Sequence, residues 1–184
     1  FLTSGYWGRE ARPFNTTTSN EISVNITALT AEGQQLARWA FEAWEMVADL
    51  DFVETAGSAD ITFNDDQGGA FATFETLGPY ITSANVNIGV GWLDFSGTDL
   101  TSYSFSTYVH EIGHALGLGH QGAYNGNATY GLDETFSNDS WQISIMSYFD
   151  QDENPTTDAD WAALVTTMMA DILAIQNLYG SPDE

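Results

Sequence analysis

The sequence contains no cysteine and no lysine, and its basic residues besides three histidines are Arg9, Arg12 and Arg38. Without cysteine the chain has no disulfide framework, which leaves its redox compartment undetermined. The 26 acidic residues give a net charge of −23. This charge excludes nucleic acid as a partner, because phosphate binding needs clustered cations, and it opposes docking on anionic lipid. The simplest explanation of this negative charge is a strongly hydrated surface suited to a salty medium. The alternative explanation is that the charge attracts cationic substrates.

Long apolar runs are also absent. No stretch approaches the length of a membrane-spanning helix, so we expect no membrane partner. Residues 1–20 lack the basic start and apolar centre of a signal peptide, and Phe1 stands where an initiator Met would be. We therefore expect a processed or truncated piece of a longer precursor. Residues 1–184 are long enough for one domain with a good core, and we expect a monomer.

The apolar pattern changes between the periods of strands and helices, which indicates an α+β or α/β fold. It predicts a twisted mixed sheet of about five strands, near residues 22–27, 52–54, 60–63, 70–74 and 86–90. Two long helices are expected near residues 31–48 and 103–117, and a C-terminal helix near 167–179. Thr30 and Thr167 are the expected N-caps, and Gly180 the final stop. Residues 1–18 should form an extended arm or a partly ordered loop, residues 94–104 a loop, and residues 181–184 a tail.

All three histidines fall within residues 110–120, whose sequence is HEIGHALGLGH. His110 and His114 are four residues apart, so on a helix both imidazoles face one side and can reach one metal ion. His120 is too far along a straight helix to join them, but Gly117 can take the left-handed conformation that turns the chain back. Three nitrogens with an open fourth position are typical of catalytic zinc. The alternative, histidines that only pack in a buried helix, leaves the use of every histidine in one motif unexplained.

This pattern and the later Met146 match the metzincin signature with its Met-turn. Residues 120–125 (HQGAYN), 146–148 (MSY) and 171–180 (DILAIQNLYG) resemble the catalytic domain of the serralysins, which are secreted bacterial zinc proteases. The resemblance extends from about Thr30 to Gly180 and is clearest from Tyr108. It implies a metzincin catalytic domain in a secreted, extracellular endopeptidase. Serralysins continue into a β-roll of calcium-binding repeats, and no such repeat occurs here.

The site residues follow from the motif and from the resemblance. His110, His114 and His120 would hold one zinc ion, which lowers the pKa of its bound water to about 7. Glu111 would accept the water proton and pass it to the leaving amine. By resemblance, Tyr148 would be a further zinc ligand that moves away to stabilise the oxyanion. The alternative for Tyr148 is a core tyrosine after a turn.

Two further segments bear on substrates and on calcium. In metzincins the stretch corresponding to Ala70–Phe74 is an antiparallel edge strand that pairs with extended protein or peptide substrates, and an ordinary hairpin strand is the alternative. Residues 121–140 lack periodicity, and we expect a loop that walls a specificity pocket. Its carboxylates, Asp133, Glu134 and Asp139, are candidates for Ca²⁺, but they lack the regular calcium-loop spacing, and a solvated loop is the alternative.

Other functions remain open on the sequence alone. A non-catalytic zinc-binding module would keep the histidines, but the presence of Glu111 counts against it. Within the enzymes, another metzincin subfamily such as a matrixin-like protease is the alternative, and contact between Tyr148 and zinc in the resting state would separate the two.

Overall fold

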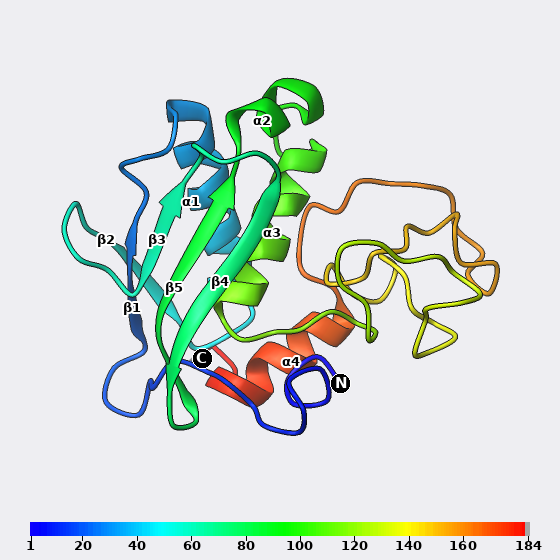
Figure 1. Cartoon of the computed structure of the whole chain (residues 1–184), viewed down its shortest axis with the longest axis horizontal. Coiled ribbons are helices and arrows are strands. Elements are labelled where there is room, and N and C mark those ends of the chain that lie inside the picture. The colour runs from blue at the N-terminus through cyan, green and yellow to red at the C-terminus, as the bar shows by residue number, and fades with distance from the viewer. Residues whose placement is uncertain (183–184) are drawn as a thin grey trace.

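The molecule contains a five-stranded mixed sheet that has its helices on one face (Figure 1). The computed structural model describes residues 1–182. Its strands are β1 (Glu21–Asn25), β2 (Asp51–Glu54), β3 (Ile61–Asn64), β4 (Ala70–Leu77) and β5 (Tyr80–Ile88). Its helices are α1 (Ala31–Glu45), α2 (Val90–Ser96), α3 (Tyr103–Ala115) and α4 (Met169–Tyr179). The predicted fold class is confirmed.

The strand order is β2-β1-β3-β5-β4, and all neighbouring pairs are parallel except β4 with β5. Strand β4 therefore lies at the edge of the sheet and is antiparallel to its only neighbour, as expected. Helices α1 and α3 lie behind the sheet, and the irregular chain between α3 and α4 forms a separate lobe beside α3 (Figure 1). Between Leu116 and Met168 the described chain contains no helix or strand.

The core lies between the sheet and these two helices. Leu36, Ala40 and Trp44 of α1 are fully buried, as the helical spacing predicts. The indole of Trp44 donates a hydrogen bond to the carbonyl of Val109 in α3 at 3.1 Å, which ties the two helices together. Thr30 caps α1 as predicted, because its hydroxyl accepts a hydrogen bond from the Gly33 amide at 3.2 Å.

Two local predictions were wrong. We expected Val90 to end a strand and residues 94–104 to form a loop, but β5 ends at Ile88 and α2 spans Val90–Ser96, so the loop before α3 is confined to residues 97–102. The chain turns at Gly89, where a side chain would collide with the backbone carbonyl of Gln67, and the alternating pattern gave no sign of this contact. We also expected Thr167 to cap α4, but the N-cap is Met168, whose amide donates to the buried carboxylate of Asp171 at 2.8 Å.

The arm of residues 1–18 packs against the turn that follows α3. Leu2 and Phe14 are buried, and Phe14 forms an isolated bridge with Ile81. The Gly119 amide donates to the carbonyl of Leu2 at 2.7 Å, and the Trp7 indole donates to the carbonyl of Gly117 at 2.8 Å. The arm thus covers the segment that leads from α3 to His120.

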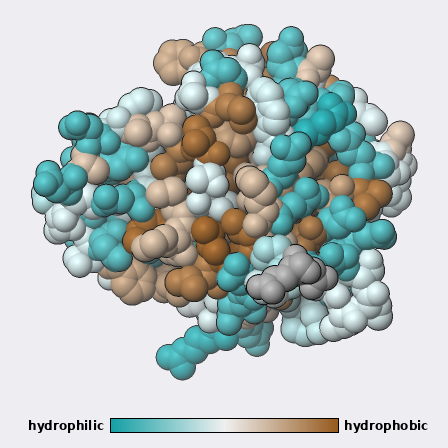
Figure 2. All heavy atoms as spheres, turned by 180° about the vertical axis from the view of Figure 1, so that it is seen from behind, coloured by the Kyte–Doolittle hydropathy of each residue, from teal (hydrophilic) through white to brown (hydrophobic). Residues whose placement is uncertain are grey.

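The outer surface is not uniformly polar. On the face behind the view of Figure 1, apolar side chains gather in the middle and hydrophilic ones surround them (Figure 2). Among the helices of residues 1–182, none has both the length and the apolar character that a bilayer span requires.

Candidate metal centre

Helix α3 carries His110 and His114, and the turn after it returns His120 to them. The turn is closed by hydrogen bonds from the Gly117 amide to the His114 carbonyl and from the Leu118 amide to the Gly113 carbonyl, both at 2.9 Å. Gly117 has φ of +95°, the left-handed conformation that its position required. Potential ligand atoms of the three histidines all lie within 4.8 Å of one another. The structure therefore brings together the three histidines that were predicted as metal ligands.

Each imidazole is oriented by a backbone carbonyl. The Nδ1 atoms of the three histidines each lie 2.8 Å from a carbonyl oxygen. The carbonyls belong to Ile145 for His110, Leu118 for His114 and Tyr124 for His120. A carbonyl only accepts, so each Nδ1 must carry the proton, and each Nε2 is left with a free lone pair.

The donor set suits a zinc ion. Burial lowers the pKa of all three imidazoles, that of His120 to about 3, so they stay neutral at ordinary pH. The Nε2 atoms of His114 and His120 lie only 2.9 Å apart, and two unprotonated nitrogens cannot hydrogen-bond to each other. A cation between them removes that conflict. Within residues 1–182 these histidines form the one group of three or more His, Cys, Asp or Glu side chains able to hold a metal.

Glu111 lies beside this group, on the side of the sheet edge. Its side chain is 7% exposed, and its Oε2 atom has no hydrogen-bond partner. Burial raises the pKa of its carboxyl to about 8. A hydrogen bond from the backbone of Ala72 in β4 has the smaller, opposite effect on this pKa. A buried carboxylate with a free oxygen and a raised pKa is suited to take up and release a proton.

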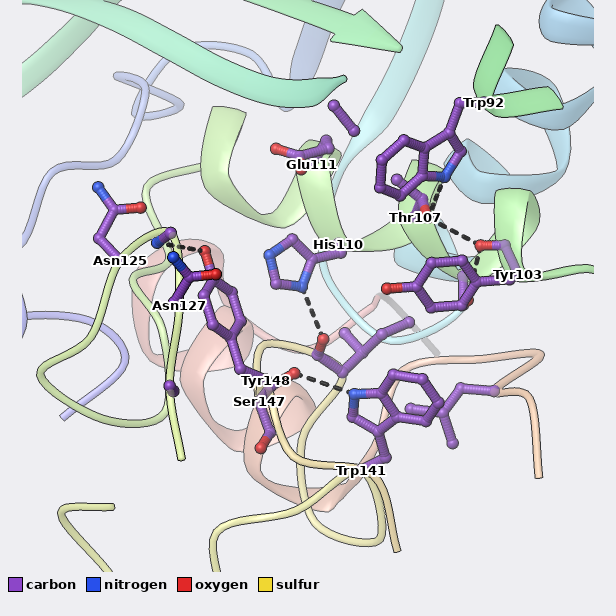
Figure 3. Close-up of a pocket in the computed structure, with 16 residues that line it drawn as sticks. Trp92, Tyr103, Thr107, His110, Glu111, Asn125, Asn127, Trp141, Ser147 and Tyr148 are labelled. Carbon is purple, nitrogen blue, oxygen red and sulfur yellow. Dashed lines mark hydrogen bonds between the residues drawn. The ribbon is translucent and has the colours of Figure 1, made fainter. Parts of the chain in front are cut away.

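A cavity of about 480 Å³ opens next to His110 and Glu111. One of its walls is aromatic: Tyr103 stacks between Trp92 and Trp141, with ring centroids 6.0 Å and 5.8 Å away (Figure 3). Asn125–Ala128 and Tyr148 line another part. The loop that follows His120 therefore does line a pocket, as the sequence predicted, and α2 contributes Trp92 unexpectedly.

Tyr148 lies next to the histidines. Its ring centroid is 4.4 Å from that of His120 and 6.2 Å from that of His110. Its hydroxyl accepts a hydrogen bond from the Gly126 amide at 3.3 Å, and burial raises the pKa of the phenol (Figure 3). Met146 is fully buried below α3, where its sulfur lies so close to Gly113 that no side chain would fit there.

The turn that carries Met146 is held by a carboxylate that the sequence analysis did not single out. Asp171 of α4 is fully buried and accepts hydrogen bonds from the Ser144 hydroxyl at 2.6 Å and the Ile145 amide at 2.8 Å. Since the Ile145 carbonyl orients His110, Asp171 connects α4 to the histidine group. An isolated acidic residue within the apolar helix was the available signal.

The three acidic calcium candidates do not converge. Asp133 accepts from the Thr129 amide at 2.8 Å, and Glu134 accepts from the Gly131 amide at 2.7 Å, both within their own loop. Asp139 is fully buried and points to other partners. The structure thus offers no shared oxygen site for calcium among these three residues.

Comparison with known proteins agrees with this geometry. The family model described as Matrixin matches residues 16–133, which include the three histidines and Glu111. The chain belongs to the matrixin family. Its curated relatives include a serralysin of Photorhabdus sp. (strain Az29), which is 32% identical to the chain, and serralysin C of Dickeya chrysanthemi, which is 36% identical. Metallopeptidase AprA of Pseudomonas marginalis is 31% identical. They confirm the resemblance to serralysins and the expectation of zinc as the cofactor.

These alignments cover 86%, 86% and 91% of this matrixin-family chain. They cover only 35%, 35% and 38% of the relatives. The chain thus spans about a third of the length of the curated proteins that it matches.

Proposed function

We propose that this chain is a zinc-dependent endopeptidase domain in which His110, His114 and His120 hold the metal. The observation that carries the proposal is the convergence of three neutral imidazoles beside a buried glutamate with a free oxygen. The relatives named serralysin and metallopeptidase support the same reaction class.

The chemistry divides between the metal and the protein. Bound zinc would lower the pKa of a coordinated water and polarise the peptide carbonyl. Glu111 is the general base: its free Oε2 accepts a proton from the attacking water and then delivers it to the departing amine. Tyr148 would be a further ligand of the bound metal, and its phenol, once displaced, would donate a hydrogen bond to the oxyanion. Its ring already lies beside His120.

The substrate is a protein or peptide bound in extended form. Residues Ala70–Phe74 lie on β4, the sheet edge next to Glu111, and an edge strand offers free backbone groups to a pairing chain. The cavity beside Glu111 then receives one substrate side chain. Its aromatic wall and Leu164 favour a large apolar group there.

The setting of the domain is also a proposal. We infer that it is secreted, in keeping with the serralysin relatives, and that residues 1–184 form one monomeric domain. The net charge of −23 supports the absence of nucleic-acid and anionic-membrane partners.

The decisive experiment joins metal analysis to proteolysis. Purified protein should contain one equivalent of zinc and should degrade casein. Casein cleavage should cease when a chelator removes the metal and should recover when zinc is returned. Glu111→Gln should be inactive, whereas Glu42→Gln, which changes an exposed glutamate of α1, should be fully active. Absence of zinc, or casein cleavage that a chelator does not affect, would overturn the proposal.

A further inference from the structure

Asp139 is a carboxylate in the interior of the irregular lobe, and neither the motif nor the proposed chemistry uses it. Its side chain is fully buried, and the ion pair found within residues 1–182 joins Arg38 to Glu54 at the surface. Its partners are hydroxyl groups. The Tyr124 phenol lies 3.1 Å from both of its oxygens, and the Ser147 hydroxyl donates to Oδ1 at 2.6 Å. Burying a carboxylate with no cation is costly, so such a group calls for a role.

The first partner, Tyr124, is in contact with two residues of the site. Its carbonyl accepts a hydrogen bond from the Nδ1 atom of His120 at 2.8 Å. Its ring stacks on His120, with centroids 5.6 Å apart, and lies 4.9 Å from the ring of Tyr148. The phenol that Asp139 holds thus belongs to a residue that orients one histidine and touches the site tyrosine.

The second partner, Ser147, lies between Met146 and Tyr148 in the turn below the metal site. Its hydroxyl donates to Asp139 and accepts from the Phe149 amide at 3.1 Å. The Tyr148 amide in turn donates to the Tyr124 hydroxyl at 3.3 Å. Asp139 therefore joins the loop that carries His120 to the turn that carries Tyr148.

The backbone at Gly122 packs closely against the Tyr124 ring and Asp139. A Cβ atom at Gly122 would lie 2.5 Å from the Tyr124 ring and 3.1 Å from Oδ2 of Asp139. The backbone of the loop thus closes directly over the hydrogen bond between the phenol and the carboxylate.

We propose that Asp139 is a positioning residue, which fixes the His120 imidazole and the Tyr148 phenol relative to each other through Tyr124 and Ser147. Asp139 is not itself one of the three histidines or a lining residue of the cavity, and it reaches the site through the hydroxyls of Tyr124 and Ser147. The inference rests on the proposed metal site, but not on proteolysis.

The test therefore measures metal binding and its geometry. Metal-free wild type, Asp139→Asn, Tyr124→Phe and the double variant are titrated with Zn²⁺ against a chelating dye, at a temperature where all remain folded. The visible bands of bound Co²⁺ report the arrangement of its ligands. Each single variant should weaken zinc binding by about 10–100-fold, the usual range for groups that orient ligands, and should change the Co²⁺ spectrum. Both variants remove the hydrogen bond between the Tyr124 phenol and Asp139, so their losses should not add, and the double variant should bind zinc no more weakly than the single variant with the larger loss.

A control separates this role from ordinary stabilisation. Asp60 is a half-buried carboxylate that accepts hydrogen bonds from the Ser23 hydroxyl and amide, away from the metal site. Asp60→Asn should lower the melting temperature and leave zinc affinity and the Co²⁺ spectrum unchanged. The proposal is overturned if Tyr124→Phe and Asp139→Asn both bind metal as wild type does, if their losses add, or if Asp60→Asn shows the same loss. If Asp139→Asn does not fold, Tyr124→Phe decides alone. Casein cleavage is not among the readouts, so a wild type that binds zinc without cleaving casein refutes only the proposed function.

Discussion

The main-chain carbonyl of Arg12 lies against the α-carbon of Gly117, where any side chain would collide with it. Gly117 is thus constrained twice, by its φ of +95° and by the N-terminal arm. The arm fits closely over the turn that returns His120 to α3. The Trp7 indole of the arm also donates a hydrogen bond to the Gly117 carbonyl. The packing of the arm and the position of His120 therefore both depend on the backbone at Gly117.

Gly117→Ala should therefore destabilise the protein by more than the conformational cost alone, which is roughly 1–2 kcal/mol for a left-handed residue with a side chain. Gly131→Ala is the matched control, because Gly131 has φ of +91° but nothing within 4 Å of an added Cβ. Urea unfolding of the metal-free proteins measures both. Equal losses would mean that the arm moves aside freely.

Glu111→Gln should keep its zinc and lose proteolysis by on the order of 10²–10⁴-fold, the usual contribution of a general base. The amide keeps the shape of the side chain but cannot accept the water proton. Steady-state kinetics with casein or a peptide, together with metal analysis, measures this. Near-native turnover would show that another group moves the proton.

The same residue should set a pH dependence of stability in the metal-free protein. Burial raises the pKa of the Glu111 carboxyl from 4.5 to about 8 in the folded state. Between these values the unfolded chain has lost the proton while the folded chain keeps it, so this group makes stability fall as pH rises from about 4.5 to about 8. Relative to wild type, Glu111→Gln should therefore gain stability over this window in denaturant unfolding. A pH-independent difference between the two proteins would contradict the assignment.

Tyr148→Phe should retain zinc and substrate binding and lower kcat by something like 10–10³-fold, as for other single oxyanion donors. The phenol oxygen would act mainly in the transition state, so KM should change little. Loss of zinc would instead make Tyr148 structural. A rise in KM at constant kcat would make it a substrate contact.

Trp141→Ala should change which substrate side chains the domain accepts. The indole forms part of the aromatic wall beside Glu111, and removing it should lower kcat/KM for peptides with a large apolar side chain at one position by roughly 10–200-fold relative to an alanine peptide. The ratio of the two substrates is the measurement, because it does not depend on the fraction of active enzyme. An unchanged ratio at every position would show that the cavity receives no side chain.

The sequence by itself determined the meeting of the three histidines and most of the sheet. His110 and His114 meet because a helix places residues four apart on one face, and Gly117 turns the chain because few other residues accept its φ. Thr30 capped its helix, and the alternating strands formed, for equally local reasons. These features depend on neighbours within a few positions.

Only the tertiary structure decided which polar groups support the site. Asp139 lies in a segment whose composition is typical of a solvated loop. It is nevertheless buried, and the hydroxyls of Tyr124 and Ser147, 15 and 8 positions away, donate hydrogen bonds to it. The helix at Val90 and the contact of the N-terminal arm with Gly117 likewise depend on segments distant in sequence. Irregular chain has no period from which such partners can be inferred, because its burial is set by what packs over it and not by local spacing.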